Sequence, residues 1–148
     1  MITSIVVGTD GSETATKAVR EAADLASRIG ATLELVSAYE PVSKQRLREE
    51  ARQVPEDMAW MVTPREDCEA TLNDAKEMVS TMGVREVVIH AREGDPADAI
   101  LDVAEERGSD LIVVGNKGMT GAKRFLLGSV PNQVSHHAPC SVLIVRTT

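Results

Sequence analysis

Short apolar runs alternate with amphipathic stretches along most of this chain. Consecutive apolar residues are typical of buried strands, whereas apolar residues three or four positions apart are typical of helices. Runs of the first kind predict five strands, at 4–8, 33–39, 87–89, 111–114 and 142–145. The second pattern predicts four helices, which begin near Ser12, Thr63, Asp95 and Ser129.

Capping signals support these helices. Ser12 and Asp95 are favourable N-cap residues. Thr63 is followed by Pro64 and then by Glu66, which is the pattern of a capping box with proline at the first position. Glycines at 30 and 83 are expected to end the first two helices. The faces expected to be buried hold Ala15, Ala18, Val19, Ala22, Ala26 and Ile29, then Cys68, Leu72, Ala75, Val79 and Met82, and then Ala97, Ile100, Leu101 and Ala104.

The order of these elements predicts an α/β fold. Apolar strands that alternate with helices indicate a parallel sheet covered on both faces, and therefore a doubly wound arrangement. No linker or repeat divides the 148 residues, so we expect one domain over 1–148. Residues 42–62 carry only a weak signal and predict an insert or lid. Ligands of such sheets bind at the carboxyl ends of the strands, where the strand order reverses.

Composition narrows the classes of function. The chain is 43% hydrophobic and 26% charged, with a formal net charge of −7 and a pI near 5.0, which argues against nucleic-acid binding. No apolar run approaches the roughly 20 residues of a membrane span, and no signal peptide pattern is present. We therefore expect a cytoplasmic protein without membrane contact. Cys68 and Cys140 match no metal or redox spacing and are expected to be thiols.

The most informative segment follows the strand at 111–114. Residues 115–130 contain four glycines and three cations, Lys117, Lys123 and Arg124, but no carboxylate. Glycine lets the backbone approach a ligand closely, and exposed N–H groups beside cations suit a phosphate. The helix that begins at Gly128-Ser129 offers a further N-terminal anion site. This segment predicts a phosphate-bearing small molecule as ligand.

Two common phosphate signatures, G-x-x-x-x-G-K-[ST] and G-x-G-x-x-G, do not occur. The loop instead has the spacing G-x2-G-x9-G-S, at Gly115, Gly118, Gly128 and Ser129. With this spacing the chain resembles the adenine-nucleotide-binding branch of the universal stress protein family. The resemblance covers almost the whole chain, through the segments 5–12, 94–96, 110–115, 127–130 and 138–145.

The resemblance implies a Rossmann-like fold of the adenine nucleotide alpha hydrolase type, with strand order 3-2-1-4-5, and a set of ligand contacts. Three residues at the carboxyl end of the first strand would lie beside the nucleoside, with the last near the ribose or a phosphate-bound metal: Gly8, Thr9 and Asp10. Two strand ends would touch adenine: Ala38 and Val114. The remaining motif residues would contact ribose and phosphates: Gly115, Gly118, Gly128, Ser129 and Val130. Lys117, Lys123 and Arg124 occupy variable positions, so only charge and location assign them to phosphate.

Several of these residues also have a structural interpretation. Asp10 is able to shape the turn or cap the first helix, and Ser129 is able to cap its own helix. Pro131 departs from the threonine or alanine common in the family and removes a backbone donor at the phosphate end. This departure makes cyclic AMP an alternative to ATP. His136 and His137 are adjacent and would diverge on a helix, so no metal site built from protein ligands is expected, although Mg²⁺ would accompany ATP.

The function that follows is an adenine-nucleotide sensor or sequestering module, with ATP as the expected ligand. No catalytic set is recognisable, so we expect hydrolysis to be very slow or absent. The resemblance implies a homodimer through the last strand, with nucleotide occupancy tuning the dimer surface or residues 42–62. A slow ATPase or self-phosphorylating enzyme and a nucleotide-free dimerisation module remain as alternatives.

Overall fold

The computed structural model of the chain describes residues 1–41, 63–117 and 127–147. Within these ranges all five predicted strands and all four predicted helices are present. The strands are β1 (Ser4–Gly8), β2 (Thr32–Tyr39), β3 (Val87–Glu93), β4 (Leu111–Gly115) and β5 (Ser141–Val145). The helices are α1 (Glu13–Ile29), α3 (Pro64–Ser80), α4 (Pro96–Arg107) and α5 (Ser129–His137). The predicted insert at 42–62 lies outside the described residues, as do Gly118, Lys123 and Arg124.

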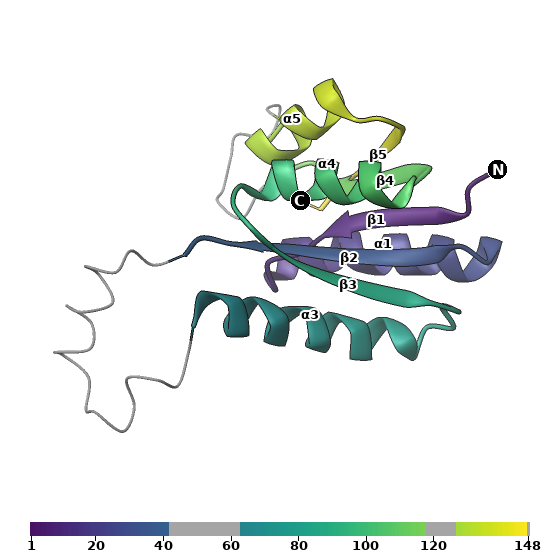
Figure 1. Ribbon diagram of the computed structural model, residues 1–148. Helices are drawn as coiled ribbons and strands as arrows, with labels where there is room; N and C mark the ends of the chain where they lie inside the picture. The colour runs from purple at the N-terminus through teal and green to yellow at the C-terminus, as the bar shows by residue number, and fades with distance from the viewer. Residues whose placement is uncertain (42–62, 118–126, 148) are drawn as a thin grey trace, which may run out of the picture.

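The strands form one parallel sheet in the order β3-β2-β1-β4-β5, which confirms the expected order (Figure 1). α1 and α3 pack on one face and α4 and α5 on the other, so the sheet is doubly wound. β1 pairs with β2 on one side and with β4 on the other. The strand order therefore reverses between β1 and β4, where their carboxyl ends leave a crevice.

Small and branched aliphatic side chains fill both layers of the core. On the α1 and α3 face, the buried alanines Ala18, Ala22, Ala23 and Ala26 bring α1 close to the sheet. On the α4 and α5 face, α4 contributes Ile100 and Val103, which pack with the strands and with Val134 of α5. Both cysteines are free thiols, as predicted, and burial raises the pKa of Cys140.

The predicted caps are confirmed. The Ser12 hydroxyl accepts a hydrogen bond from the Ala15 N–H, and the Asp95 carboxylate accepts one from the Asp98 N–H. Thr63 and Glu66 form the predicted capping box. Gly30, in the left-handed region at φ +72°, ends α1 as predicted.

Several local predictions were wrong. α3 ends at Ser80 rather than near Gly83, because the Thr81 N–H bonds back to the carbonyls of Met78 and Val79 and tightens the last turn. Ile29, placed on the buried face of α1, is 45% exposed at the helix end, and Leu101 is only partly buried. β3 continues to Glu93 because it pairs with β2 along its length.

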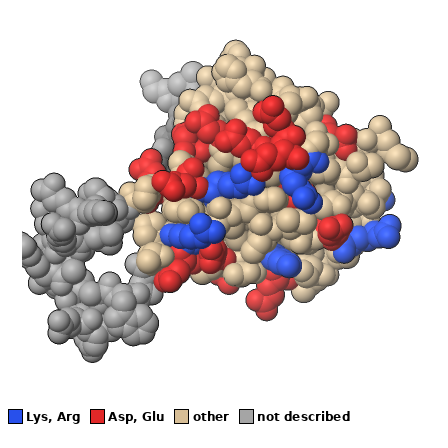
Figure 2. Space-filling view, viewed as in Figure 1, with Lys and Arg blue, Asp and Glu red and all other residues tan. Residues whose placement is uncertain are grey.

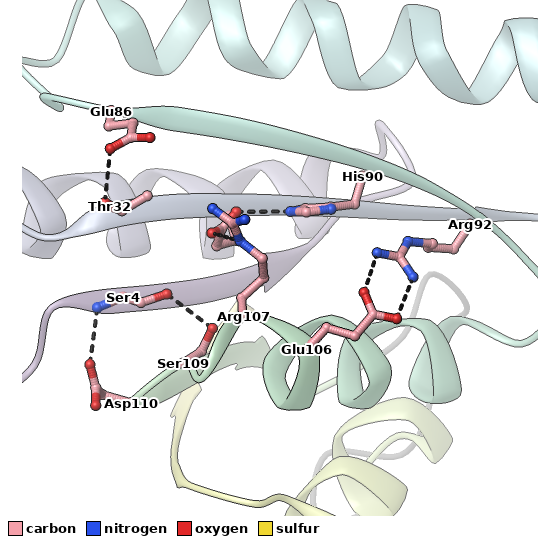
Figure 3. A network of polar contacts seen from close by, with 10 residues as sticks. Ser4, Thr32, Glu86, His90, Arg92, Glu106, Arg107, Ser109 and Asp110 are labelled. Atoms are coloured by element: carbon pink, nitrogen blue, oxygen red, sulfur yellow. Dashed lines mark hydrogen bonds and ion pairs between the residues drawn. The ribbon is translucent and has the colours of Figure 1, made fainter.

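A polar clasp anchors the amino-terminal end of β1. One carboxylate oxygen of Asp110 accepts hydrogen bonds from the N–H groups of Thr3 and Ser4 and from the Thr3 hydroxyl. These hydrogen bonds, those from Thr3 first, hold the pKa of Asp110 below its usual range. The Ser4 and Ser109 hydroxyls lie 3.0 Å apart beside it (Figure 3). The clasp lies at the end of the sheet opposite the crevice.

The surface charge is mixed. Figure 2 shows basic and acidic side chains interleaved over the face formed by α3, β3 and α4, with acidic groups gathered over α4. None of the helices in the described ranges is both long and apolar enough to cross a bilayer.

Candidate functional site

The turn after β1 forms one wall of the candidate site. The Thr9 N–H donates to the carbonyl of Val36, which extends the pairing of β1 with β2 by one residue. The Thr9 hydroxyl accepts from the Gly11 N–H, and the Asp10 carboxylate accepts from the Ser12 N–H. Gly11 has φ +82°, a left-handed conformation that glycine adopts without strain. These bonds fix the Asp10 backbone directly beside the N-terminus of α1.

An open cavity occupies the crevice at the carboxyl ends of β1, β2 and β4. The crevice holds about 760 Å³ of space when the open solvent at its mouth is included. Its apolar walls come from β2, α4, β4 and α5, through Val36, Ala38, Ile100, Val114 and Val130. Among the described residues, the lining contains one carboxylate, from Asp10, and one cationic side chain, from Lys117.

Gly8 allows α4 to close onto the end of β1. A Cβ atom at Gly8 would lie 2.6 Å from Cδ1 and 3.1 Å from Cγ1 of Ile100. Such distances are too short for ordinary carbon contacts, so a larger residue would push Ile100 away. Because Ile100 also lines the cavity, the absence of a side chain at Gly8 determines where this part of the apolar wall lies.

Asn116 organises the base of the glycine-rich loop. Its N–H donates to the carbonyl of Val145 at the end of β5, and its own carbonyl accepts from the N–H of Gly128. The chain thus leaves the sheet after Gly115 and returns at Gly128, which is bonded to Asn116. We call Gly115, Asn116, Lys117 and Gly128 the loop base.

α5 points its N-terminus into the same region. Gly128 is its N-cap, in an extended conformation, and no side chain caps the helix. The first turn therefore begins with Ser129 at the first helical position, which corrects the interpretation of Ser129 as an N-cap. Pro131 has no N–H, and the Asn132 N–H is taken by the carbonyl of Gly128. Ser129 and Val130 are left as the first-turn amides able to meet an anion.

The structure gathers most of the predicted site residues around one cavity. The predicted residues that line it are Gly8, Thr9, Asp10, Ala38, Val114, Gly115, Lys117 and Val130. Gly128 and Ser129 do not line the cavity, although Val130 and Pro131 of the same helix turn do. Gly118 lies outside the described residues.

Other residues also line the cavity although the sequence did not predict them, and they fall into two groups. Ser12, Thr14, Ala15 and Ala18 belong to the start of α1, and Val36, Ser37, Pro96 and Ile100 belong to β2 and α4. Val36 could have been found, because it lies two residues before Ala38 and so on the same face of the strand. Ile100 was predicted to be buried, but nothing in the sequence places it at the ligand.

The described residues contain no group of three or more metal-ligating side chains. Asp10 is the carboxylate able to meet a cation that arrives with a phosphate chain. The donor set therefore fits an organic ligand with an apolar ring and a polar, negatively charged end.

Known proteins resemble this chain over nearly its full length. The model of the universal stress protein family matches residues 1–146. The chain is 40% identical to the universal stress protein Rv1636 of Mycobacterium tuberculosis over 145 residues, 98% of this chain and 97% of that protein. It is 36% identical to the universal stress protein YxiE of Bacillus subtilis over 149 residues, 99% of this chain and 100% of that protein. A crystal structure of a universal stress protein in complex with cAMP is 32% identical and matches with a TM-score of 0.73, over 99% of this chain and 98% of that one.

Proposed function

This chain belongs to the universal stress protein family, and on that premise we propose that it binds an adenine nucleotide in the crevice between β1 and β4. One observation carries the proposal: the cavity there joins an apolar slot to a polar end. The adenine ring would lie between Ala38 and Val114, with the ribose over Gly8 and Asp10. The phosphates would extend toward Lys117 and the first turn of α5.

ATP is the ligand we expect from the glycine spacing, with Mg²⁺ contacted by Asp10 directly or through water. When bound, Mg²⁺ would neutralise phosphate charge. Gly118 and Ser129 would contribute backbone and hydroxyl donors to the phosphates, whereas the Gly128 N–H already donates to the carbonyl of Asn116. Since the lining residues that the structure describes offer a single carboxylate and no side-chain nucleophile paired with a base, we expect binding without appreciable turnover.

Cyclic AMP is the second candidate, and two observations favour it. Pro131 leaves few first-turn amides on α5, which suits a single phosphate better than a chain of three. A structural neighbour of this chain was crystallised with cAMP. On either ligand the protein would act as a sensor or sequestering module in a stress response.

Calorimetric titration of nucleotide-free protein with ATP and with cyclic AMP, with and without Mg²⁺, tests the proposal. Several charge-assisted hydrogen bonds, each of ~1.5–3 kcal/mol, should give a dissociation constant of roughly 1 µM, or about −8 kcal/mol. Tighter binding of ATP that depends on Mg²⁺ would identify ATP. Tighter binding of cyclic AMP without dependence on Mg²⁺ would identify the cyclic nucleotide. If the folded protein binds neither ATP nor cyclic AMP, the proposal is contradicted, and a nucleotide-free dimerisation module is favoured.

We also propose that the chain forms a homodimer through β5. This strand lies at one edge of the sheet and pairs only with β4 among the described strands. Leu143 and Ile144 are each 41% exposed, which is unusual for large apolar residues in a strand and leaves an edge suited to a second copy.

Sedimentation equilibrium at micromolar concentration should give twice the mass of the chain, and Ile144→Lys should return it to the single-chain mass. The added charge would be desolvated at the contact, whereas in a monomer it would stay in water. Arg20→Ala, on an exposed position of α1, is the control and should stay dimeric. A wild-type chain that sediments as a monomer would rule out this contact.

A further inference from the structure

We propose that Thr147 is a positioning residue for the nucleotide site: it fastens the loop base to β5 and α1 and so preorganises the loop base for the ligand. The proposal rests on the function proposed above. Thr147 does not line the cavity, and it is only 3% exposed although it lies beyond the last strand. A polar residue so deeply buried after the end of a strand needs specific partners.

Those partners lie on two other elements. The N–H and the hydroxyl of Thr147 both donate to Oδ1 of Asn116, at 2.8 and 3.1 Å. The carbonyl of Thr147 accepts from Nζ of Lys17 on α1, at 3.3 Å. Its methyl group lies over Gly115, where an added Cβ would meet Cγ2 at 3.1 Å. Thr147 therefore contacts the loop base through both polar and apolar atoms.

Asn116 connects this residue to the loop. Its side chain holds Thr147, its N–H holds the end of β5, and its carbonyl holds Gly128 at the return of the loop. All these bonds meet at one residue, so they close the base of a loop that leaves and re-enters the fold there. Groups that are held in place before a ligand binds need not be ordered by it, so a fixed loop base lowers the conformational entropy cost of binding.

The arrangement also makes Thr147 a link between the two surfaces of the proposed function. β5, the proposed dimer strand, ends two residues before Thr147. Thr147 binds Asn116 of the loop base, and the two neighbours of Asn116, Gly115 and Lys117, line the cavity. A displacement of β5 would therefore move Thr147, and its hydrogen bonds to Asn116 would displace the loop base at the ligand site.

The test replaces the Thr147 hydroxyl. Thr147→Val keeps the shape and the backbone bonds but removes the donor to Asn116. We expect about fivefold weaker binding of the nucleotide that the wild type prefers, equivalent to ~1 kcal/mol. Thr147→Ser retains the hydroxyl and should restore most of the affinity. Thr3→Val is the matched control, because it removes the same group from a 2.9 Å hydrogen bond at the opposite end of the sheet. Thr3→Val should bind nucleotide with the affinity of the wild type and should melt at a temperature similar to that of the wild type.

Amide hydrogen exchange separates failure of this proposal from failure of the proposed function. The Gly128 amide, bonded to the Asn116 carbonyl, should exchange severalfold faster in Thr147→Val than in wild type or Thr3→Val. If the variant shows faster exchange but the wild type binds no nucleotide, the role of Thr147 in positioning the loop base would be supported. Only the proposed function, nucleotide binding, would then be contradicted. If the wild type binds nucleotide, an unchanged affinity in Thr147→Val would overturn the role of Thr147. Unchanged exchange at Gly128 in this variant would overturn it as well.

Discussion

Gly115→Val is expected to weaken nucleotide binding by about 50-fold or more while the chain remains folded. The added Cβ would lie 3.1 Å from Cγ2 and 3.4 Å from Oγ1 of Thr147, and 3.6 Å from the carbonyl oxygen of Lys117. Overpacking of this kind typically costs ~1–3 kcal/mol, and the upper part of that range corresponds to the expected loss in affinity. Because Gly115 and Lys117 both line the cavity, the displacement falls on the ligand site itself.

A suppressor variant separates this mechanism from a direct clash with the ligand. Gly115→Ala should weaken binding less than valine, and its residual clash is with Cγ2 of Thr147, which Thr147→Ser removes. The double variant Gly115→Ala, Thr147→Ser should therefore bind more tightly than Gly115→Ala alone, as a positive coupling in a double-mutant cycle. Calorimetric titration of the four proteins measures it. Additive losses would mean that the alanine methyl acts on the ligand and not on Thr147.

The fold of this chain could be predicted because its local signals agree with one another. Ser12, Thr63 and Asp95 each combine a capping side chain with an apolar pattern that starts immediately afterward. The end of α3 was misplaced because Gly83 is a strong stop signal, whereas the helix is ended earlier by bonds to Thr81 that have no sequence signature. The exposure of Leu143 and Ile144 also could not be predicted, because an apolar run has the same appearance in an edge strand and in a central one.

The candidate site was predictable where it depends on backbone geometry. Gly8 was predicted to end the first strand and Gly115 to follow the fourth, and side chains from distant elements lie against both positions. Those side chains, Ile100 and Thr147, are far from them in sequence, and no local pattern pairs them. Thr147 in particular reads as an ordinary polar residue near the end of the chain, and only its burial and its partners reveal it.

Glu34→Ala is expected to lower the free energy of unfolding by about 3 kcal/mol, or roughly 6–12 °C in melting temperature. The Glu34 side chain on β2 is 2% exposed and joins two other elements. One carboxylate oxygen lies 2.8 Å from Nε2 of His90 on β3, and the other accepts from Nε of Arg107 on α4 at 2.7 Å (Figure 3). Removing it leaves both partners without their bond and opens a void between the sheet and α4.

The magnitude depends on which partner stays buried. Arg107 is 44% exposed and is able to turn to water, whereas the His90 side chain is 11% exposed and has less access to it. Glu34→Gln keeps the volume and one acceptor oxygen, and should cost less than alanine, about 1–2 kcal/mol. A second ion pair, between Arg92 on β3 and Glu106 on α4, is bidentate and lies nearer the surface, so it should retain the contact of β3 with α4.

Thermal and urea unfolding measure these differences, and the control is Glu86→Ala, which removes an exposed carboxylate 3.4 Å from the Thr32 hydroxyl. That substitution should stay within about 0.5 kcal/mol of wild type. Since Glu34 does not line the cavity, the folded Glu34→Gln protein should bind nucleotide within about twofold of wild type. A Glu34→Ala protein as stable as the Glu86→Ala control would show that the buried carboxylate does not hold α4 to the sheet. A large loss of nucleotide affinity in Glu34→Gln would instead show that α4, through Ile100, transmits changes in the network to the ligand wall.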